Sequence, residues 1–226
     1  MTRPNRQVPD PAIASALTAD IERGCAALGV SADPALADRL ASFIVLLAKW
    51  NRVYNLTAVR DPRAMVARHV LDSLAVLPYL SRGRLLDAGT GAGLPGVPIA
   101  MARPELSVTL LDSRAKKLRF VRQAVVELGL NNVEVVNERM EQYRPEPAFD
   151  MVISRAVASL GDLYHSTSHL VRPGGRFLFM KGACPQGELD AFDAAVQPHV
   201  TLLKVPGLDV ARHLVWFEQQ QRERDS

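Results

Sequence analysis

A glycine-rich stretch directly after a short apolar run constrains the fold of this chain more than any other feature. Residues 84–86 have the composition of a strand, and Gly89, Gly91, Gly93 and Gly96 follow closely. Glycine tolerates the tight turn from a strand into a helix and lets the backbone approach a bound group. The helix that follows directs its partially positive N-terminus at that group. The stretch therefore predicts an α/β fold with a ligand site at this turn.

Two carboxylates narrow the choice of ligand. The spacing Gly91-x-Gly93-x-x-Gly96 alone is a weak dinucleotide signal. Asp87, just before the first glycine, would repel a pyrophosphate, whereas it favours a cationic ligand such as S-adenosylmethionine (SAM). Asp112 ends the next β-rich run about twenty residues later, where an acid accepts hydrogen bonds from the ribose of either cofactor. We predict SAM rather than NAD.

Strand-like and helix-like runs alternate from Gly83 onwards, which implies a parallel sheet with right-handed crossovers. Further strands are expected at 133–137, at 149–155 and, behind a Pro-Gly-Gly turn, within 170–181, and an antiparallel pair at 201–205 and 212–217 completes the sheet. In this order, the acid-capped glycine loop, the second-strand acid, the Phe-Asp strand and the Pro-Gly-Gly turn resemble the class I SAM-dependent methyltransferases. That resemblance implies a Rossmann-like, mostly parallel sheet with an antiparallel terminal strand.

The segment before the sheet has a helical pattern. One helix is expected to begin at Asp33 and Pro34, because apolar residues recur behind them at helical spacing. Another helix is expected over 62–80, with Met65, Val66, His69, Val70, Leu74 and Leu77 facing inward. We therefore expect an N-terminal helical cap over residues 1–82, a methyltransferase core over 83–218 and a polar tail over 219–226, with both chain ends disordered.

The net charge of +3 is small but unevenly distributed. Between residues 113 and 126 the basic residues Arg114, Lys116, Lys117, Arg119 and Arg122 occur with no acid among them. A second group, Lys49, Arg52, Arg60, Arg63 and Arg68, is opposed only by Asp61. Such runs are usually solvated helix faces, but two of them in a methyltransferase suit a polyanionic substrate.

The two cysteines, Cys25 and Cys184, are too few for a disulfide framework. No stretch approaches the apolar length of a membrane span, and no signal peptide is visible. A cytoplasmic protein with no membrane partner is expected.

Polar helix ends in the N-terminal segment carry a more specific resemblance. Residues 49–59 and 68–74, together with 94–98, 110–113 and 154–158, make the chain similar to the RsmG (GidB) family of bacterial 16S rRNA methyltransferases. The resemblance covers roughly residues 38–182. It implies methyl transfer from SAM to N7 of a loop guanine, guanine 527, in 16S rRNA. The substrate could be naked rRNA, a precursor particle or the small ribosomal subunit, and the enzyme is expected to be a monomer.

The resemblance also implies a set of cofactor contacts. With the two acids and the loop glycine found above, the predicted SAM-binding residues are Asp87, Gly89, Gly91, Leu94, Asp112, Met140, Glu141 and Arg155. Met140 stands where the family often has alanine, and a backbone contact would survive that change.

Polar side chains near the expected site are candidates for substrate binding: Asn51, Asn55, Arg68, His69, Lys116, Lys117 and Lys181. Two amides on one helix face are costly to bury unpaired. A lysine that ends the fifth strand would face the crevice where open α/β sheets bind ligands. A buried, hydrogen-bonded histidine accounts for His69 equally well. Trp50 and Tyr54, one helical turn apart, are either core packing or a stacking platform for a splayed base.

No catalytic residue is assigned, and none is required for a methyl transfer to N7. The N7 atom carries a lone pair and no proton, so alignment for an in-line displacement can supply roughly 7–11 kcal/mol. After Phe149 and Asp150 there is no Pro-Pro-Tyr motif of the amino-nitrogen methyltransferases, and Cys184 lacks the Pro-Cys setting of a C5-cytosine nucleophile. His165 and His169 have a metal-ligand spacing without a third ligand, so no metal is expected.

Three alternatives remain. A small-molecule methyltransferase of the same fold would have an apolar lid and no use for the basic segments. A non-catalytic RNA-binding assembly factor should have lost Asp87 and Asp112. A NAD-dependent dehydrogenase is disfavoured by Asp87 and by the absence of a catalytic pair.

Overall fold

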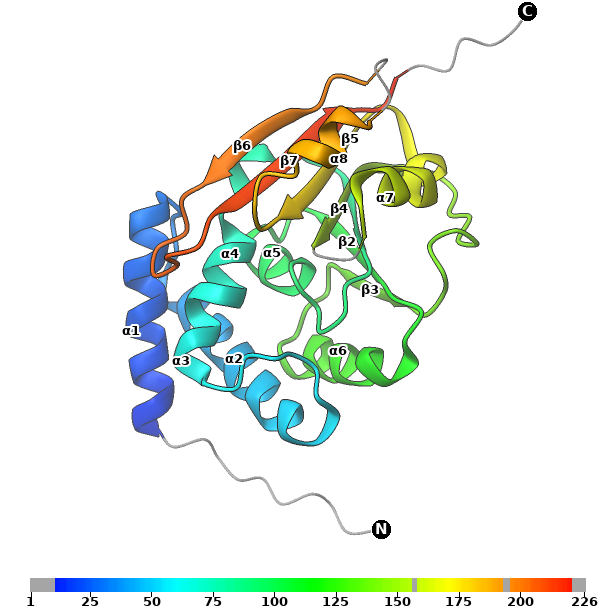
Figure 1. The fold of residues 1–226 in the computed structure, drawn as a ribbon. Helices are drawn as coiled ribbons and strands as arrows, with labels where there is room; N and C mark the ends of the chain where they lie inside the picture. Colours follow the sequence, from blue (N-terminus) through cyan, green and yellow to red (C-terminus); the bar gives the residue numbers. More distant parts are fainter. Residues whose placement is uncertain (1–10, 156–157, 193–195, 221–226) are drawn as a thin grey trace, which may run out of the picture.

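A seven-stranded sheet organises the chain (Figure 1). The computed structural model describes residues 11–155, 158–192 and 196–220. The strands are β1 Arg84–Ala88, β2 Ser107–Leu111, β3 Val133–Val136, β4 Phe149–Arg155, β5 Val171–Lys181, β6 His199–Leu203 and β7 Arg212–Glu218. They lie in the order β3-β2-β1-β4-β5-β7-β6, with parallel pairing from β3 to β5 and antiparallel pairing of β7 with β5 and with β6. The predicted fold class is confirmed.

Both faces of the sheet are buried, because its strands are apolar on both sides. In β1, Leu85 belongs to one hydrophobic cluster and Leu86 to the other, and in β4 Ile153 and Val152 divide in the same way. Near-continuous apolar strands of this kind are typical of a parallel sheet that has helices on both faces.

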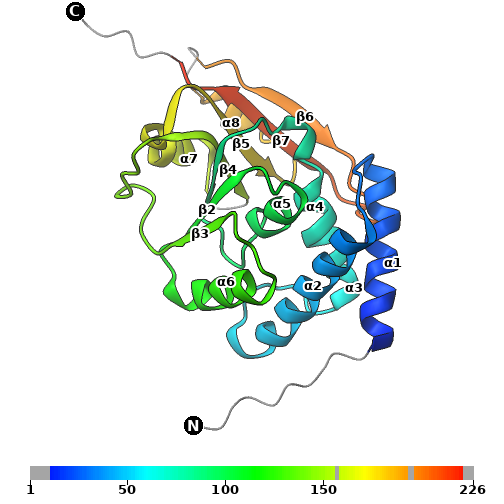
Figure 2. The same cartoon turned by 180° about the vertical axis from the view of Figure 1, so that it is seen from behind.

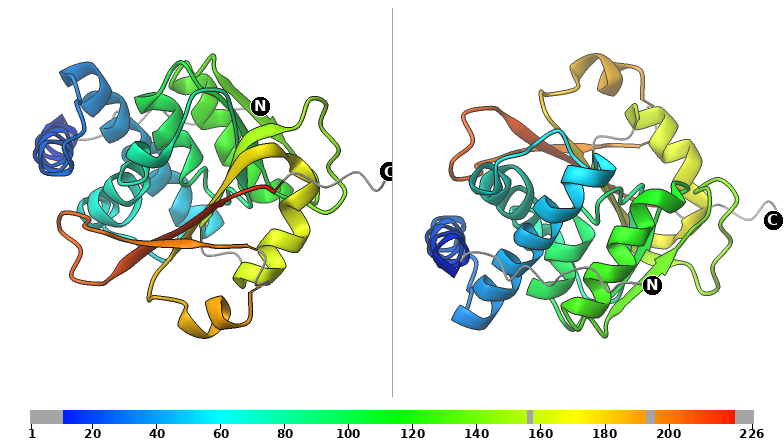
Figure 3. Two further views of the ribbon diagram at one scale, coloured as in Figure 1. Left: turned by 90° about the horizontal axis from the view of Figure 1, so that it is seen from above. Right: turned by 90° about the horizontal axis from the view of Figure 1, so that it is seen from below.

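The helices cover the two faces unequally. They are α1 Pro11–Leu28, α2 Pro34–Tyr54, α3 Pro62–Met65, η1 Val66–Leu71, α4 Asp72–Leu74, η2 Leu77–Tyr79, α5 Gly96–Ala102, α6 Ala115–Glu127, α7 Leu160–Thr167, η3 Ser168–Leu170 and α8 Gln186–Asp190. On one face α2 packs on α5 and α6, and α1 packs on α2 as the outermost helix (Figures 1 and 2). Helix α7 lies on the opposite face (Figure 3). Within the described residues, no helix has the length and apolarity needed to cross a bilayer.

Helix α2 begins where the sequence predicts. Asp33 accepts a hydrogen bond from the Leu36 amide at 2.7 Å, and Pro34 occupies the first turn. The helix ends at Asn55, whose backbone is left-handed with φ 49°. Asparagine tolerates this conformation better than most residues, so it turns the chain toward the sheet.

The single helix predicted over residues 62–80 is wrong. Asp61 caps the start through the Arg63 and Ala64 amides, but the turns divide into α3, the π-helical η1, α4 and the 3₁₀ turn η2. A π-helical segment widens the turn and changes which side chains face inward. The inward positions were nevertheless predicted correctly, since Met65, Val66, His69, Val70, Leu74 and Leu77 are all buried.

One further boundary differs from the sequence expectations, and one is not tested by the structure. The predicted Pro-Gly-Gly turn lies inside β5, where the register with β4 shifts between Phe149 and Met151. The predicted division at residue 82 stays a prediction, because one hydrophobic cluster runs without a break from α1 and α2 to the sheet. Of the predicted disordered ends, residues 1–10 and 221–226 lie outside the described part of the chain.

Candidate cofactor and substrate site

The glycine-rich loop after β1 is held from below by Asp87. The Asp87 carboxylate is fully buried, and its Oδ2 accepts hydrogen bonds from Thr90 Oγ1 at 2.6 Å and from the Gly96 amide at 2.8 Å. Burial raises the pKa of Asp87 to about 6. A side chain at Gly96 would collide with Asp87 and Leu110, so glycine is required there.

The structure places Asp87 beneath the loop, and its predicted contact with the cofactor stays a prediction. Because its side chain is fully buried under the loop, the carboxylate does not line the cavity above it. Among the described residues, its Oδ1 has no hydrogen-bond partner. Asp87 therefore fixes the shape of the loop and places a carboxylate beneath it.

Asp112 joins the loop to the end of β2. Its Oδ2 accepts from the Gly91 amide at 2.9 Å and its Oδ1 from the Arg114 amide at 2.7 Å. The residue is 9% exposed and lines the cavity. Each carboxylate oxygen can accept more than one hydrogen bond, so Asp112 retains capacity for a pair of ribose hydroxyls.

A cavity of about 590 Å³ opens at the carboxyl ends of the parallel strands, beside this loop. Ligand sites in open α/β sheets lie at this edge, and pockets for small molecules measure about 300–1,000 Å³. Gly91, with φ +58°, forms part of the wall, and a Cβ there would point to Lys117 Nζ at 3.6 Å. The loop, the Asp112 carboxylate and the volume together fit an adenosyl cofactor.

The loop that follows α2 forms a second wall, and His69 fixes it. His69 Nδ1 donates to the Arg68 carbonyl at 2.9 Å, so its Nε2 accepts from Thr57 Oγ1, also at 2.9 Å. Burial, and secondarily the charge of Arg155, lower the pKa of His69 to about 4. Asn51 completes the wall, because its amide binds the Thr57 amide and the Val59 carbonyl.

Asp72 holds two arginines at the floor of the cavity. Arg155, the last residue of β4, donates from Nη1 to Asp72 Oδ2 at 3.0 Å and to the Arg68 carbonyl at 3.2 Å. Arg212, the first residue of β7, places Nε 3.2 Å from Asp72 Oδ1, an ion pair without hydrogen-bond geometry. The Asp72 side chain is only 3% exposed, so one buried carboxylate fixes two guanidinium groups.

The structure brings most of the predicted cofactor residues together. The cavity is lined by Gly89, Gly91, Leu94, Asp112, Met140, Glu141 and Arg155. It is also lined by four predicted substrate residues, Arg68, His69, Lys117 and Lys181. The Lys181 ammonium is already engaged, since Nζ donates to the Ala158 carbonyl at 2.7 Å and to Glu188 Oε2 at 2.8 Å.

Three predicted substrate residues lie outside the cavity lining. The Asn51 side chain is buried and used for the wall, and Asn55 ends α2 and accepts from Arg60 at 3.1 Å. Lys116 is exposed on α6 beside Lys117. Cys184 lies exposed in the loop after β5, away from the cavity lining.

Sequence reasoning missed Arg212, Asp72 and Thr57. Arg212 carries no local signal, because it is one arginine at the start of an outer strand. Only the antiparallel direction of β7, which pairs Lys181 with His213, brings that strand start to the ligand edge of the sheet. Asp72 and Thr57 lie close to His69 and Asn51 in the sequence. Thr57 bonds to His69, which lies in the π-helical turn η1, and Asp72 follows that turn and pairs with Arg155.

Comparisons with known proteins identify the family of the chain. The GidB family model, described as rRNA small subunit methyltransferase G, matches residues 37–215. The Ribosomal RNA small subunit methyltransferase G of Aromatoleum aromaticum is 51% identical over 207 residues, which covers 89% of this chain and 98% of that protein.

Solved structures show the same fold at low identity. A methyltransferase from Pyrococcus furiosus has a TM-score of 0.56 at 16% identity and covers 82% of this chain and 100% of its own. The N-methyltransferase NodS from Bradyrhizobium japonicum, in complex with S-adenosyl-l-homocysteine, has a TM-score of 0.54 at 13% identity and covers 77% of this chain and 100% of its own. The predicted family and the predicted cofactor, SAM, are both borne out by the family match. The chain belongs to the GidB family, the small subunit rRNA methyltransferases G.

Proposed function

We propose that this protein transfers the methyl group of SAM to N7 of guanine 527, a loop guanine of 16S rRNA. Membership of the GidB family supports rRNA as the substrate. The observation that carries the choice of N7 is that the buried titratable groups around the cavity are already occupied by hydrogen bonds and ion pairs within the protein. His69, Asp72 and Asp112 line it, and each is already engaged in holding protein atoms.

None of these three groups is arranged to remove a proton from a substrate. Both ring nitrogens of His69 are used, and its lowered pKa of about 4 keeps the ring neutral near pH 7. Asp72 lies between two arginines, and Asp112 accepts from two backbone amides. A guanine N7 needs no proton removed, so its methylation requires no catalytic role from these three groups.

The transfer balances without a proton. SAM supplies a methyl group on a positively charged sulfur. The carbon–sulfur bond breaks as the N7–carbon bond forms, the electron pair stays on the sulfur, and the positive charge passes to the guanine ring. The protein's contribution is alignment, which can supply roughly 7–11 kcal/mol. We assign the cofactor's ribose to Asp112 and its remaining contacts to Gly89, Gly91, Leu94, Met140, Glu141 and Arg155.

The cations of the cavity suit an RNA substrate. Arg68, Lys117, Arg155 and Arg212 all line it, and they can donate to phosphate oxygens or to the O6 edge of guanine. The narrow major groove of A-form RNA hides N7, so the target guanine must be unpaired and splayed into the cavity.

The test is methyl transfer from labelled SAM to unmodified 16S rRNA, free and in small subunits. Chain cleavage at 7-methylguanine maps the product, and we expect a single site, at guanine 527. The matched control is the same RNA with 7-deazaguanine at that position, which keeps the base but lacks the N7 acceptor. Transfer to the control RNA at an equal rate, or transfer to no RNA by an enzyme that binds SAM, would overturn the proposal.

A further inference from the structure

We propose that the C-terminal end of α2 and the basic side of α6 form a platform for single-stranded RNA beside the cavity. On this platform, Tyr54 stacks an unpaired base that flanks the methylated guanine. The inference rests on the proposed function only for its choice of RNA. It adds a contact outside the cavity that positions the strand.

An exposed aromatic ring is the first support. Trp50 stacks on Tyr54 with ring centroids 5.1 Å apart and packs against Phe120 of α6 at 5.9 Å. Tyr54 is nevertheless 41% exposed, and the neighbouring Val53 is 72% exposed. Because Trp50 covers one face of the Tyr54 ring, a base would stack on the opposite face.

This exposure is unusual in the molecule. Of the large apolar side chains that are exposed in the described residues, Tyr54 alone is aromatic. Trp216 shows the contrast, because His199 stacks on it at 4.2 Å and the Arg176 guanidinium lies 5.0 Å from its ring. Both His199 and Arg176 therefore already contact the Trp216 ring. Tyr54 stacks on Trp50 alone and remains exposed to solvent.

The charge around Tyr54 is the second support. Every ion pair among the described residues uses a cation from outside the two basic segments, 49–68 and 114–122. Arg52, Lys116 and Arg119 are exposed and form no ion pair in the described part of the chain. A surface of uncompensated positive charge with a stacking ring has the two components of a single-strand site, a backbone contact and a base contact.

Continuity with the cavity is the third support. Helices α2 and α6 are in contact, and their neighbouring ends lie side by side in Figures 1 and 3. From Tyr54 the chain runs directly into Leu56, Thr57 and Val59, which line the cavity. On α6, exposed Lys116 precedes Lys117, which also lines it. A strand with its guanine in the cavity would therefore cross this surface on leaving it.

The experiment compares RNA binding by Tyr54→Leu and Tyr54→Phe. Loss of one base stack should weaken the RNA by roughly tenfold in Tyr54→Leu, whereas Tyr54→Phe keeps the ring and should bind like the wild type. Val126→Ala is the control, because Val126 is 76% exposed on α6. SAM affinity should be unchanged in all three variants. Tm should be unchanged in Tyr54→Phe and Val126→Ala, whereas Tyr54→Leu also loses its stack on Trp50, so its RNA binding is compared at a temperature where it is folded.

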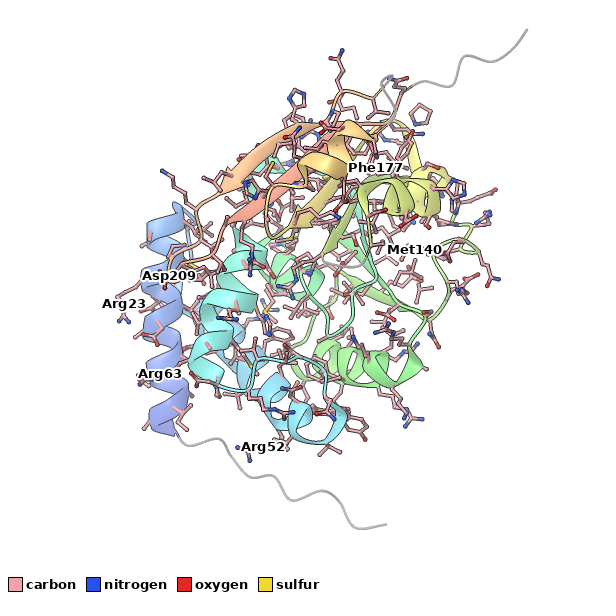
Figure 4. The ribbon with its side chains drawn as sticks, in the orientation of Figure 1. Arg23, Arg52, Arg63, Met140, Phe177 and Asp209 are labelled. Atoms are coloured by element: carbon pink, nitrogen blue, oxygen red, sulfur yellow. The ribbon has the colours of Figure 1, made fainter. Side chains whose placement is uncertain are left out.

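Abasic substitutions in the RNA identify the stacked base. At one nucleotide near the target guanine, removal of the base should weaken wild-type binding about tenfold and Tyr54→Leu binding no further. For the charge, Arg52→Ala should lower the salt dependence of binding. Arg23→Ala should not, since Arg23 pairs with Asp20 on α1 and lies well apart from Arg52 (Figure 4).

The failure of this inference can be told apart from the failure of the proposed function. Equal RNA affinity and KM for Tyr54→Leu and the wild type, in an enzyme that methylates the guanine, would overturn the platform alone. Absence of methyl transfer with a tenfold effect of Tyr54→Leu on RNA binding would retain the platform and overturn the methylation site.

Discussion

The cations of this protein fall into two groups that differ in what holds them. In and around the cavity, Arg155 and Arg212 share Asp72, and Lys181 pairs with Glu188. On the surface formed by α6 and the end of α2, Arg52, Lys116 and Arg119 have no carboxylate partner within the described residues. Both groups would meet the same polyanion, but they are built for different tasks.

The difference follows from the energetics of fixed and free charges. A buried carboxylate holds an arginine in one geometry, which a methyl transfer needs because small displacements of the reactants are costly. An exposed, unpaired lysine keeps its rotamer freedom and its long-range field, which favours capture of RNA over a wide surface. Lys117 links the groups, since it belongs to the basic side of α6 and lines the cavity.

Removal of the Asp72 carboxylate should have the largest effect on stability and activity, because Arg155 and Arg212 would lose the group that holds them in place. In Asp72→Ala two partly buried arginines lose their partner, and breaking a buried pair of this kind costs about 3–5 kcal/mol. We expect the free energy of unfolding to fall by about that amount, with methyl transfer reduced at least tenfold at temperatures where the variant is folded. Denaturant unfolding and single-turnover rates measure the two effects.

The control for Asp72 is an exposed ion pair. Glu218, which pairs with Arg176, has a side chain that is 62% exposed, so Glu218→Ala should cost less than about 1 kcal/mol. If Asp72→Ala were as mild as Glu218→Ala, the two arginines would not depend on Asp72 for their position.

Asp112→Ala tests the part of the cavity that is assigned to the cofactor. The variant loses the one carboxylate that is assigned to the ribose and that also holds the Gly91 amide. Leaving the ribose hydroxyls and the Gly91 amide without their acceptor should weaken SAM binding by about 1–3 kcal/mol. Calorimetric titration measures the affinity, with Asp112→Asn as the variant that keeps one acceptor and loses less. An unchanged SAM affinity in Asp112→Ala would place the ribose elsewhere.

The cofactor side of the site could be predicted from the sequence because local segments build it. The glycine loop, Asp112 after β2 and Arg155 at the end of β4 follow consecutive parallel strands, whose carboxyl ends meet at one edge. Even here the position of the Asp87 side chain beneath the loop could not be predicted. A carboxylate at a strand end can face up into the cavity or down beneath the loop, and the sequence pattern does not distinguish the two.

The substrate side could not be predicted to the same extent, because it depends on long-range pairing. Asn51 looked like a free amide on a helix, yet the chain after α2 folds back and uses both of its polar atoms. Arg212 reaches the cavity through the antiparallel return of the chain, and Asp72 through a π-helical turn where a regular helix was expected.

Low pH should destabilise the cavity but not the exposed basic surface, because His69 is one of the buried groups that line the cavity. Its folded pKa of about 4 lies below the ordinary 6.5, so between these values the unfolded chain binds a proton that the folded protein does not. Stability from neutral His69 is thus full above pH 6.5 and is lost as the pH falls. At pH 5 the loss is about 2 kcal/mol, from about 1.4 kcal/mol per pH unit.

The raised pKa of Asp87, about 6 against 3.8, acts in the opposite direction over an overlapping range, because it makes the folded state the better proton acceptor. A comparison of variants removes this contribution. The destabilisation by His69→Gln should be about 2 kcal/mol smaller at pH 5 than at pH 7.5 in denaturant unfolding. Equal destabilisation at both values would mean that the folded histidine titrates normally.

Substitution of one free surface cation should have the smallest effect. Lys116→Ala removes a single charge that has no carboxylate partner in the described part of the chain, so RNA binding should weaken only a few-fold at physiological salt. The slope of log affinity against log salt should fall by about 0.7 if Lys116 neutralises one phosphate of a single strand. SAM affinity should not change, whereas Lys117→Ala should alter both affinities, because Lys117 lines the cavity beside Gly91. If Lys116→Ala left the salt slope intact, this lysine would be a solvated charge only, and the basic side of α6 would owe its RNA contact to Lys117 and Arg119.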